Sequence, residues 1–291
     1  MKIQKMIFGA LLFFSALVLI ACNVNTDLDT DKIQVSVSIL PQKAFVEAVA
    51  KDKVEINVVV PPGSSPATYE PTPQESIRLE SADIYFAIGV PTEAANIMSL
   101  IDINVTRLVS LHTLVSEEYP DIMVGGQRDP HIWLSVNRVI KIIEIIRDEM
   151  ILLDEDNSEI YTINAASFIS ELNDLKVYAE MKLTNLPNNK FIVFHPAFRY
   201  LAQDFGLEMY ALEQDGKEAT PQRLAEMIDF AKAEGIKVIF YQSEFSSTQA
   251  QSFAEEIGGQ TMMLVPLSPN YISNMISMID LFYEVSVSNE S

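Results

Sequence analysis

The sequence predicts an α/β protein with two lobes, each a mostly parallel sheet flanked by helices, joined by one long rigid helix. Short apolar, β-branched runs alternate with amphipathic stretches, this alternation occurs in two series, and a long stretch without proline or glycine separates the series. Strands that alternate with helices are typical of parallel sheets covered by helices on both faces. Two such series therefore indicate two lobes.

The predicted strands are short runs rich in valine and isoleucine. The first series has candidates at residues 33–40, 54–60, 83–89 and 104–110. The second series has candidates at residues 190–196, 236–242 and 261–267. We expect binding residues just beyond such strands, because ligands of open α/β sheets bind outside the carboxyl ends of the strands.

The stretch between the two series predicts two long helices. Residues 136–153 carry apolar side chains at helical spacing. After a polar break, a second helix extends to Leu186 and would be about 40 Å long. We therefore predict an N-terminal lobe at residues 33–156, a connecting helix at residues 157–186 and a C-terminal lobe at residues 187–291.

The N-terminus predicts export and a lipid anchor. Two lysines precede an apolar run that ends in Ala21 and Cys22, the pattern of a lipoprotein signal peptide over residues 1–21. The alternative is a chance cysteine near a cleavage site. We interpret residues 22–32 as a polar tether, with Cys22 as the lipid-modified residue that holds the protein at the periplasmic or extracellular face of a membrane.

Composition excludes several classes of protein. The formal charge is −20, and removal of the leader with its two lysines leaves −22, which excludes a nucleic-acid binder. Cys22 is the only cysteine, so neither a disulfide nor a thiolate metal site can form within the chain. Phosphate-binding, hydrolase and metalloprotease motifs are absent. We expect a monomeric protein that is not an enzyme.

Two histidines are candidate metal ligands. His131 follows Pro130 in RDPHIWLS, and His195 ends a predicted strand and precedes Pro196. Imidazole suits zinc and related metals. The alternative is that each histidine is a hydrogen-bonded, partly buried side chain. We interpret His112, on an ordinary turn, as structural.

Two imidazoles do not complete a metal site, so carboxylates are the expected additions. The candidates near predicted strand ends are Glu213, Asp215, Glu218 and Glu244. Each could instead be a solvated surface charge, because most carboxylates are exposed.

Five motifs together resemble the zinc/manganese solute-binding lipoproteins of bacterial ABC transporters. They are YEPTPQE after a VPPG loop, DPHIWLS, FHPAFRYLAQDFGL, GKEATPQRL and VPLSPNYISNM, and they span nearly all of the chain after Lys32. The resemblance implies two α/β lobes, a metal ion held in the cleft between them, and delivery of that ion to a membrane permease after limited closure of the lobes.

The resemblance also implies which residues bind the metal. His131 matches the second ligand of the family and His195 the third, and a histidine at the third position favours zinc over manganese. The first and fourth ligands are lost, because Ala67 occupies the position of a histidine and Val265 that of an aspartate. Neither replacement carries a donor atom.

Three hypotheses follow from this reduced ligand set. The protein binds zinc or another divalent metal through His131 and His195, completed by water or by a carboxylate such as Glu244 or Glu213. Alternatively, the cleft holds a metal chelate or another small ligand near Trp133. In the third hypothesis the protein is an envelope lipoprotein without a transport role.

Overall fold

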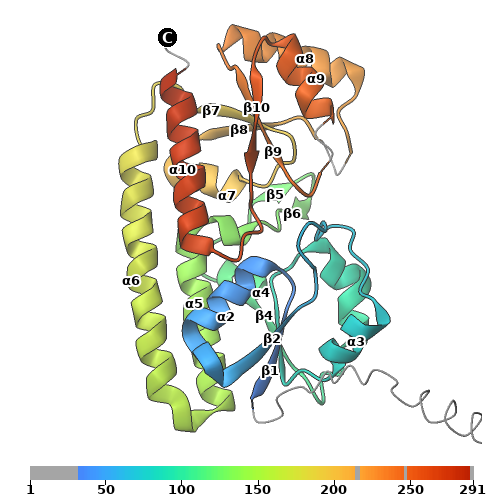
Figure 1. Ribbon diagram of the computed structural model, residues 1–291, viewed down its shortest axis with the longest axis vertical. Coiled ribbons are helices and arrows are strands. Elements are labelled where there is room, and N and C mark those ends of the chain that lie inside the picture. The colour runs from blue at the N-terminus through green and yellow to red at the C-terminus, as the bar shows by residue number, and fades with distance from the viewer. Residues whose placement is uncertain (1–31, 214–216, 246–247, 289–291) are drawn as a thin grey trace, which may run out of the picture. The chain divides into compact units, whose positions relative to one another are not determined.

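The computed structural model describes residues 32–213, 217–245 and 248–288, and the chain from Lys32 onward forms one compact unit. Two four-stranded sheets, each with all strands parallel, lie in this unit and are flanked by helices (Figure 1). The predicted fold class is confirmed. Cys22 and the predicted leader lie outside the described residues.

The first sheet has the strand order β2-β1-β3-β4. Its strands are β1 (Ile33–Val37), β2 (Val54–Val58), β3 (Ile84–Ala87) and β4 (Arg107–Ser110). The helices in this part of the chain are α2 (Leu40–Ala50), α3 (Pro73–Glu80) and α4 (Leu111–Ser116), with a π-helical turn at Glu93–Ile97. All four strands fall within the runs that the sequence predicts.

The second sheet has the strand order β10-β9-β7-β8. Its strands are β7 (Lys190–Val193), β8 (Glu208–Ala211), β9 (Val238–Gln242) and β10 (Gln260–Leu264). The helices that surround it are α7 (Arg199–Phe205), α8 (Pro221–Ala233), α9 (Thr248–Glu256) and α10 (Tyr271–Ser288). In Figure 1, α8 and α9 lie on one side of this sheet and α10 lies on the other.

The sequence analysis did not identify three strands. One is β8, and the other two form a short antiparallel hairpin of β5 (Met123–Val124) and β6 (Gln127–Arg128). The residues of β8, EMYA, lack the apolar β-branched run of the other strands. The hairpin strands have two residues each, which is too short for alternation along a strand to be recognised.

One large apolar core contains side chains from both sheets. Val37 of β1 and Phe240 of β9 belong to it, and so does Phe282 of α10. The opposite faces of the sheets pack into smaller cores, with Tyr85 in one and Ile239 in the other. The alternation along each strand thus separates the shared core from two peripheral ones.

Two long helices run beside the sheets: α5 (Val136–Leu153) and α6 (Ser158–Leu183). The 26 residues of α6 give it a length of about 39 Å. It packs against α2 and α5 beside the first sheet and against α10 beside the second (Figure 1). No helix of the described residues is apolar over enough length to span a bilayer.

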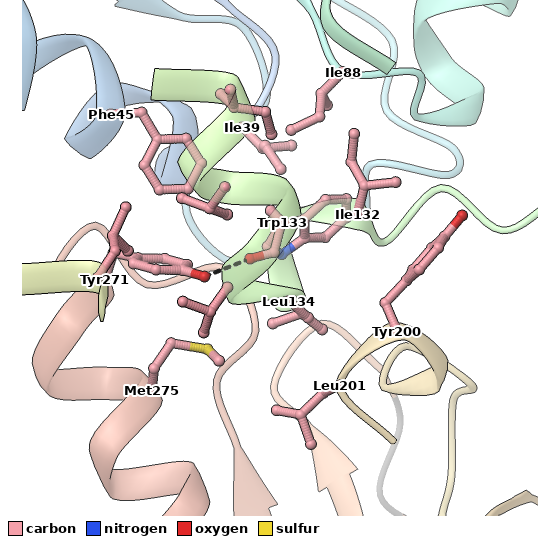
Figure 2. Close-up of a cluster of buried hydrophobic side chains, with 14 of the residues drawn as sticks. Ile39, Phe45, Ile88, Ile132, Trp133, Leu134, Tyr200, Leu201, Tyr271 and Met275 are labelled. Atoms are coloured by element: carbon pink, nitrogen blue, oxygen red, sulfur yellow. Dashed lines mark hydrogen bonds between the residues drawn. The ribbon is translucent and has the colours of Figure 1, made fainter. Parts of the chain in front are cut away.

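Trp133 lies where the two lobes meet. It belongs to a short 3₁₀ helix, Ile132–Leu134, and its side chain is buried. Its indole Nε1 donates to the carbonyl of Pro266, at 3.0 Å, after β10. Its own carbonyl accepts a hydrogen bond from the hydroxyl of Tyr271 at the start of α10, at 2.8 Å, as Figure 2 shows. These bonds tie the segment before α5 to two elements of the second lobe.

We expect Tyr271→Phe to lower the free energy of unfolding by about 1–2 kcal/mol, because the ring stays while the buried carbonyl of Trp133 loses a donor. Urea unfolding of both proteins measures this difference. Tyr283→Phe on the same helix is the control, because that side chain is 36% exposed. A Tyr271→Phe protein as stable as the control would contradict the role of this bond.

The loop between β2 and α3 is held in place by its neighbours. Thr72 caps α3, its amide donates to the Glu75 carboxylate at 2.7 Å, and the Tyr69 hydroxyl donates to the same carboxylate at 2.7 Å. The amide of Thr92 donates to the carbonyl of Pro66 at 3.1 Å, and Asn96 donates to the carbonyl of Tyr69 at 2.8 Å. The loop therefore has a fixed path over the end of the sheet.

The stability that the cap of α3 contributes should depend on pH. Burial alone would raise the pKa of Glu75, but hydrogen bonds from Thr72 and Tyr69 lower it overall. A carboxyl with a lowered pKa stabilises the folded state above its unfolded pKa of about 4.3, and this stabilisation is lost as the pH falls.

We expect Glu75→Gln to lower the free energy of unfolding by about 0.5–1 kcal/mol at pH 7 and by nothing measurable near pH 3. Chemical unfolding at the two pH values tests this. Glu80→Gln, at the exposed last position of α3, controls for the loss of one charge. A pH-independent cost for Glu75→Gln would contradict the charge dependence.

Candidate functional site

A pocket of about 670 Å³ lies between residues that follow strands of both sheets. Ala67, from the loop after β2, and His131, after the hairpin, line it from the first lobe. His195 and Glu213, directly beyond β7 and β8, and Glu244, beyond β9, line it from the second. The pocket therefore occupies the position expected of a ligand site in parallel sheets, beyond the carboxyl ends of the strands.

Asp129 fixes the position of His131. One carboxylate oxygen of Asp129, Oδ1, accepts from the backbone amide of His131 at 2.9 Å and contacts its ring Nδ1 at 2.7 Å. Pro130 lies between them, so the carboxylate and the ring are joined by a short, rigid segment. Burial lowers the pKa of His131, although Asp129 opposes this shift. At neutral pH the imidazole is therefore neutral, as metal binding requires.

His195 is fixed in an equivalent way by Glu213. Its Nδ1 lies 2.7 Å from Oε2 of Glu213, which is buried. The ring stacks on Phe245, with ring centres 4.2 Å apart and an interplanar angle of 19°. Gln242, the last residue of β9, donates to the backbone carbonyl of His195 at 3.0 Å. Residues at the ends of β8 and β9, the two strands that flank β7, thus set the orientation of this imidazole.

The two imidazoles face each other across the pocket. A carboxylate can only accept hydrogen bonds, so a neutral imidazole that donates from Nδ1 to its carboxylate leaves the Nε2 lone pair for another partner. The two Nε2 atoms are 3.3 Å apart. The site therefore presents two converging imidazole donors, one from each lobe, to the same point.

The carboxylates suggested by the sequence occupy different places. Glu213 contacts the Nδ1 side of His195, away from the facing Nε2 atoms. Glu244 lines the pocket, and its buried Oε2 has no hydrogen-bond partner in the described part of the chain. Glu218 is exposed, and Asp215 lies outside the described residues. Within the described ranges, no three histidine, cysteine or acidic side chains are grouped closely enough to hold a metal ion.

The two positions that lack a donor lie near the histidines. Ala67 lines the same pocket as His131 and His195. Val265 follows β10 and lines an adjoining pocket of about 210 Å³, which shares Glu244 and Leu267 with the larger one. The backbone carbonyl of Val265 accepts from Asn274 of α10 at 2.7 Å. The surrounding structure thus fixes the backbone at both positions.

His112 lies apart from the two facing histidines. It is the second residue of α4 and lies beside Gly89 and Arg128, where a Cβ on Gly89 would come within 2.7 Å of its ring. Burial and the charge of Arg128 lower its pKa. It does not line the large pocket, in agreement with the structural role expected for it.

The sequence analysis did not identify Asp129, Phe245 or Arg199 as residues of the site. All three line the pocket. The spacing of Asp129, two residues before His131, is the one signal in the sequence, because an aspartate readily bonds to the backbone two residues on. The contacts of Phe245 and Arg199 depend on the packing of separate elements and leave no pattern in the sequence.

Two α/β lobes joined by a long helix, with a pocket between the strand ends, define a two-lobed solute-binding protein. The chain belongs to the family described as zinc-uptake complex component A, periplasmic, whose pattern matches residues 35–285. This is a family of solute-binding transport proteins and not of enzymes.

Curated relatives agree with this family. The zinc-binding lipoprotein AdcA of Streptococcus pneumoniae is 31% identical over 286 residues, which cover 89% of this chain and 57% of AdcA. The high-affinity zinc uptake protein ZnuA of Bacillus subtilis is 28% identical, with 82% of this chain and 80% of ZnuA covered. The chain therefore spans little more than half the length of AdcA.

A solved structure shows the same fold. The crystal structure of a protein named ZnuA superposes with a TM-score of 0.82 and 32% sequence identity. The match covers 88% of this chain and all of that one. The resemblance expected from the five motifs is thus confirmed at the level of family and fold.

Proposed function

We propose that this protein is the solute-binding component of an ABC metal importer and captures a divalent metal ion, zinc, in the pocket between its lobes. Family membership and relatives named for zinc binding or zinc uptake support the class of cargo. Imidazole donors without a cluster of carboxylates favour zinc over manganese, which prefers oxygen ligands.

The separation of the two Nε2 atoms is the observation that carries this proposal. Two imidazoles that share a tetrahedral zinc, with Zn–N bonds of 2.0–2.1 Å, have their nitrogens about 3.3 Å apart. His131 and His195 have the same separation, 3.3 Å. Two facing lone pairs repel each other unless a cation lies between them, so the pair is arranged for a positively charged guest.

The carboxylates have two roles in this proposal: two orient the histidines and one binds the metal. Asp129 and Glu213 orient the imidazoles and raise their basicity, as carboxylates behind zinc-bound histidines do. Glu244 is the proposed third protein ligand, reached by a small closing movement of the pocket, because it lines the pocket and its buried Oε2 has no hydrogen-bond partner among the described residues. Water completes the coordination. The absence of donors at Ala67 and Val265 makes the expected affinity lower than that of a four-ligand site.

Delivery to a permease and anchorage at the membrane are part of the same proposal. Cys22, as a lipid-modified residue, would keep the protein beside its permease, on the outer side of the membrane that the permease spans. The shared apolar core and the contacts of α6 support capture by a limited movement of the lobes.

Metal content tests the proposal. We expect the wild-type protein, stripped with a chelator and dialysed against zinc, to hold about one zinc per chain. His131→Ala and His195→Ala should reduce this to near zero, because one imidazole cannot hold the ion alone. Inductively coupled plasma mass spectrometry measures the stoichiometry.

His112→Ala is the matched control and should retain zinc, because His112 lies outside the pocket. Circular dichroism of all variants shows whether each is folded. Zinc content near zero in the wild-type protein and in all three variants would refute zinc as the cargo.

Restoring the missing donors gives a second test. We expect Ala67→His, in a loop whose path is fixed by Thr92 and Asn96, to raise zinc affinity at least about tenfold. Val265→Asp should add to this gain when the two changes are combined. Isothermal titration calorimetry measures the affinities, and Ala67→Gln serves as a control of similar bulk without an imidazole. Equal affinities of the double variant and the wild type would contradict the proposed geometry.

A further inference from the structure

Arg199 places a positive charge in the pocket. It is the first residue of α7 and lines the pocket together with the two histidines. Its Nε lies 3.8 Å from Oδ2 of Asp129, the carboxylate that orients His131. Its Nη1 is buried and makes no hydrogen bond in the described part of the chain. The Arg199 side chain is 25% exposed, so the accessible part of its guanidinium can donate to an acceptor on a ligand in the pocket.

Arg199 is one of three arginines that line the pocket. Arg128 and Arg223 also line the pocket. Asp129, Glu213 and Glu244 line the pocket as well, so the lining carries charges of both signs and can contact a ligand that has a cationic and an anionic part.

The pocket is also larger than a metal ion requires. Its volume of about 670 Å³ lies within the range of small-molecule sites. Ala67 contributes only a methyl group to the wall of this pocket. A small ligand in this pocket could therefore both fill the space beside Ala67 and supply a donor that Ala67 lacks.

We propose that the metal is bound as a complex with a small carboxylate chelator, whose carboxylate binds Arg199 and whose other donors occupy the coordination positions that the protein leaves open. This inference rests on the proposed function, because His131 and His195 still bind the metal. The planar guanidinium of arginine matches a carboxylate in a two-point contact. Glu244 lines the same pocket, and a small movement of its side chain would bring the carboxylate to the metal.

Zinc titrations with and without a chelator test this inference. The probes are zinc alone, and zinc with equimolar citrate, L-histidine or oxalate, each titrated into metal-free protein. We expect at least one chelator to raise the apparent zinc affinity of the wild type about tenfold or more. Each chelator alone, without zinc, should bind far more weakly. Mass spectrometry of the native complex should then show protein, zinc and chelator together.

Arg199→Lys is the diagnostic variant, because it keeps the positive charge and loses the planar two-point contact. The readout is the ratio of zinc affinity with chelator to zinc affinity without it, which corrects for any change in zinc binding itself. We expect this ratio to fall to about one or below in Arg199→Lys. Arg78→Lys, on the exposed surface of α3, should keep the wild-type ratio.

Different outcomes would contradict the chelate inference and the proposed zinc binding. If all three chelators lower the zinc affinity of the wild type as simple competitors do, the chelate inference is wrong while zinc binding through the histidines stands. If the wild type binds zinc neither alone nor with a chelator, the proposed function itself is wrong. A chelator-dependent gain that is equal in wild type and Arg199→Lys would also overturn the assignment of Arg199.

Discussion

The position of the site depends on how Trp133 is bound between the lobes. Its indole donates to Pro266 in the second lobe, and its carbonyl accepts from Tyr271. His131 lies only two residues earlier, so these bonds also fix the distance from His131 to the second sheet. The shared apolar core, part of which is drawn in Figure 2, supports the same arrangement. The approach of the two Nε2 atoms to 3.3 Å is a consequence of this packing.

The wall of the pocket around Ala67 is held in place, although Ala67 carries no donor atom. The loop of Ala67 is held by Thr92, Asn96 and the cap of α3, although an alanine needs no such positioning. A loop that supports no ligand atom can still shape a wall of the pocket. In combination with Arg199, this loop gives the pocket a different chemical character from a cage of four metal ligands. In the proposed complex, the cargo would be selected by charge and size as well as by metal coordination.

Much of the fold could be predicted from the sequence. Seven of the eight parallel strands and both long helices follow from apolar periodicity, because strands and helices bury side chains at different spacings. The remaining strand, β8, has the residues EMYA and pairs with β7 through backbone bonds that do not depend on its side chains. The hairpin of β5 and β6 is too short to show a period.

The sequence by itself determined the two-lobed α/β class and pointed to the two histidines, because these follow from residue type and local spacing, whereas the roles of positions 67 and 265 were implied only by the resemblance to the family. Only the tertiary structure decided which carboxylate meets which imidazole. Glu213 is 18 residues from His195, and Arg199 is 70 residues from Asp129. Such pairs form when separate elements pack together, and the packing of distant elements leaves no periodic signal along the chain.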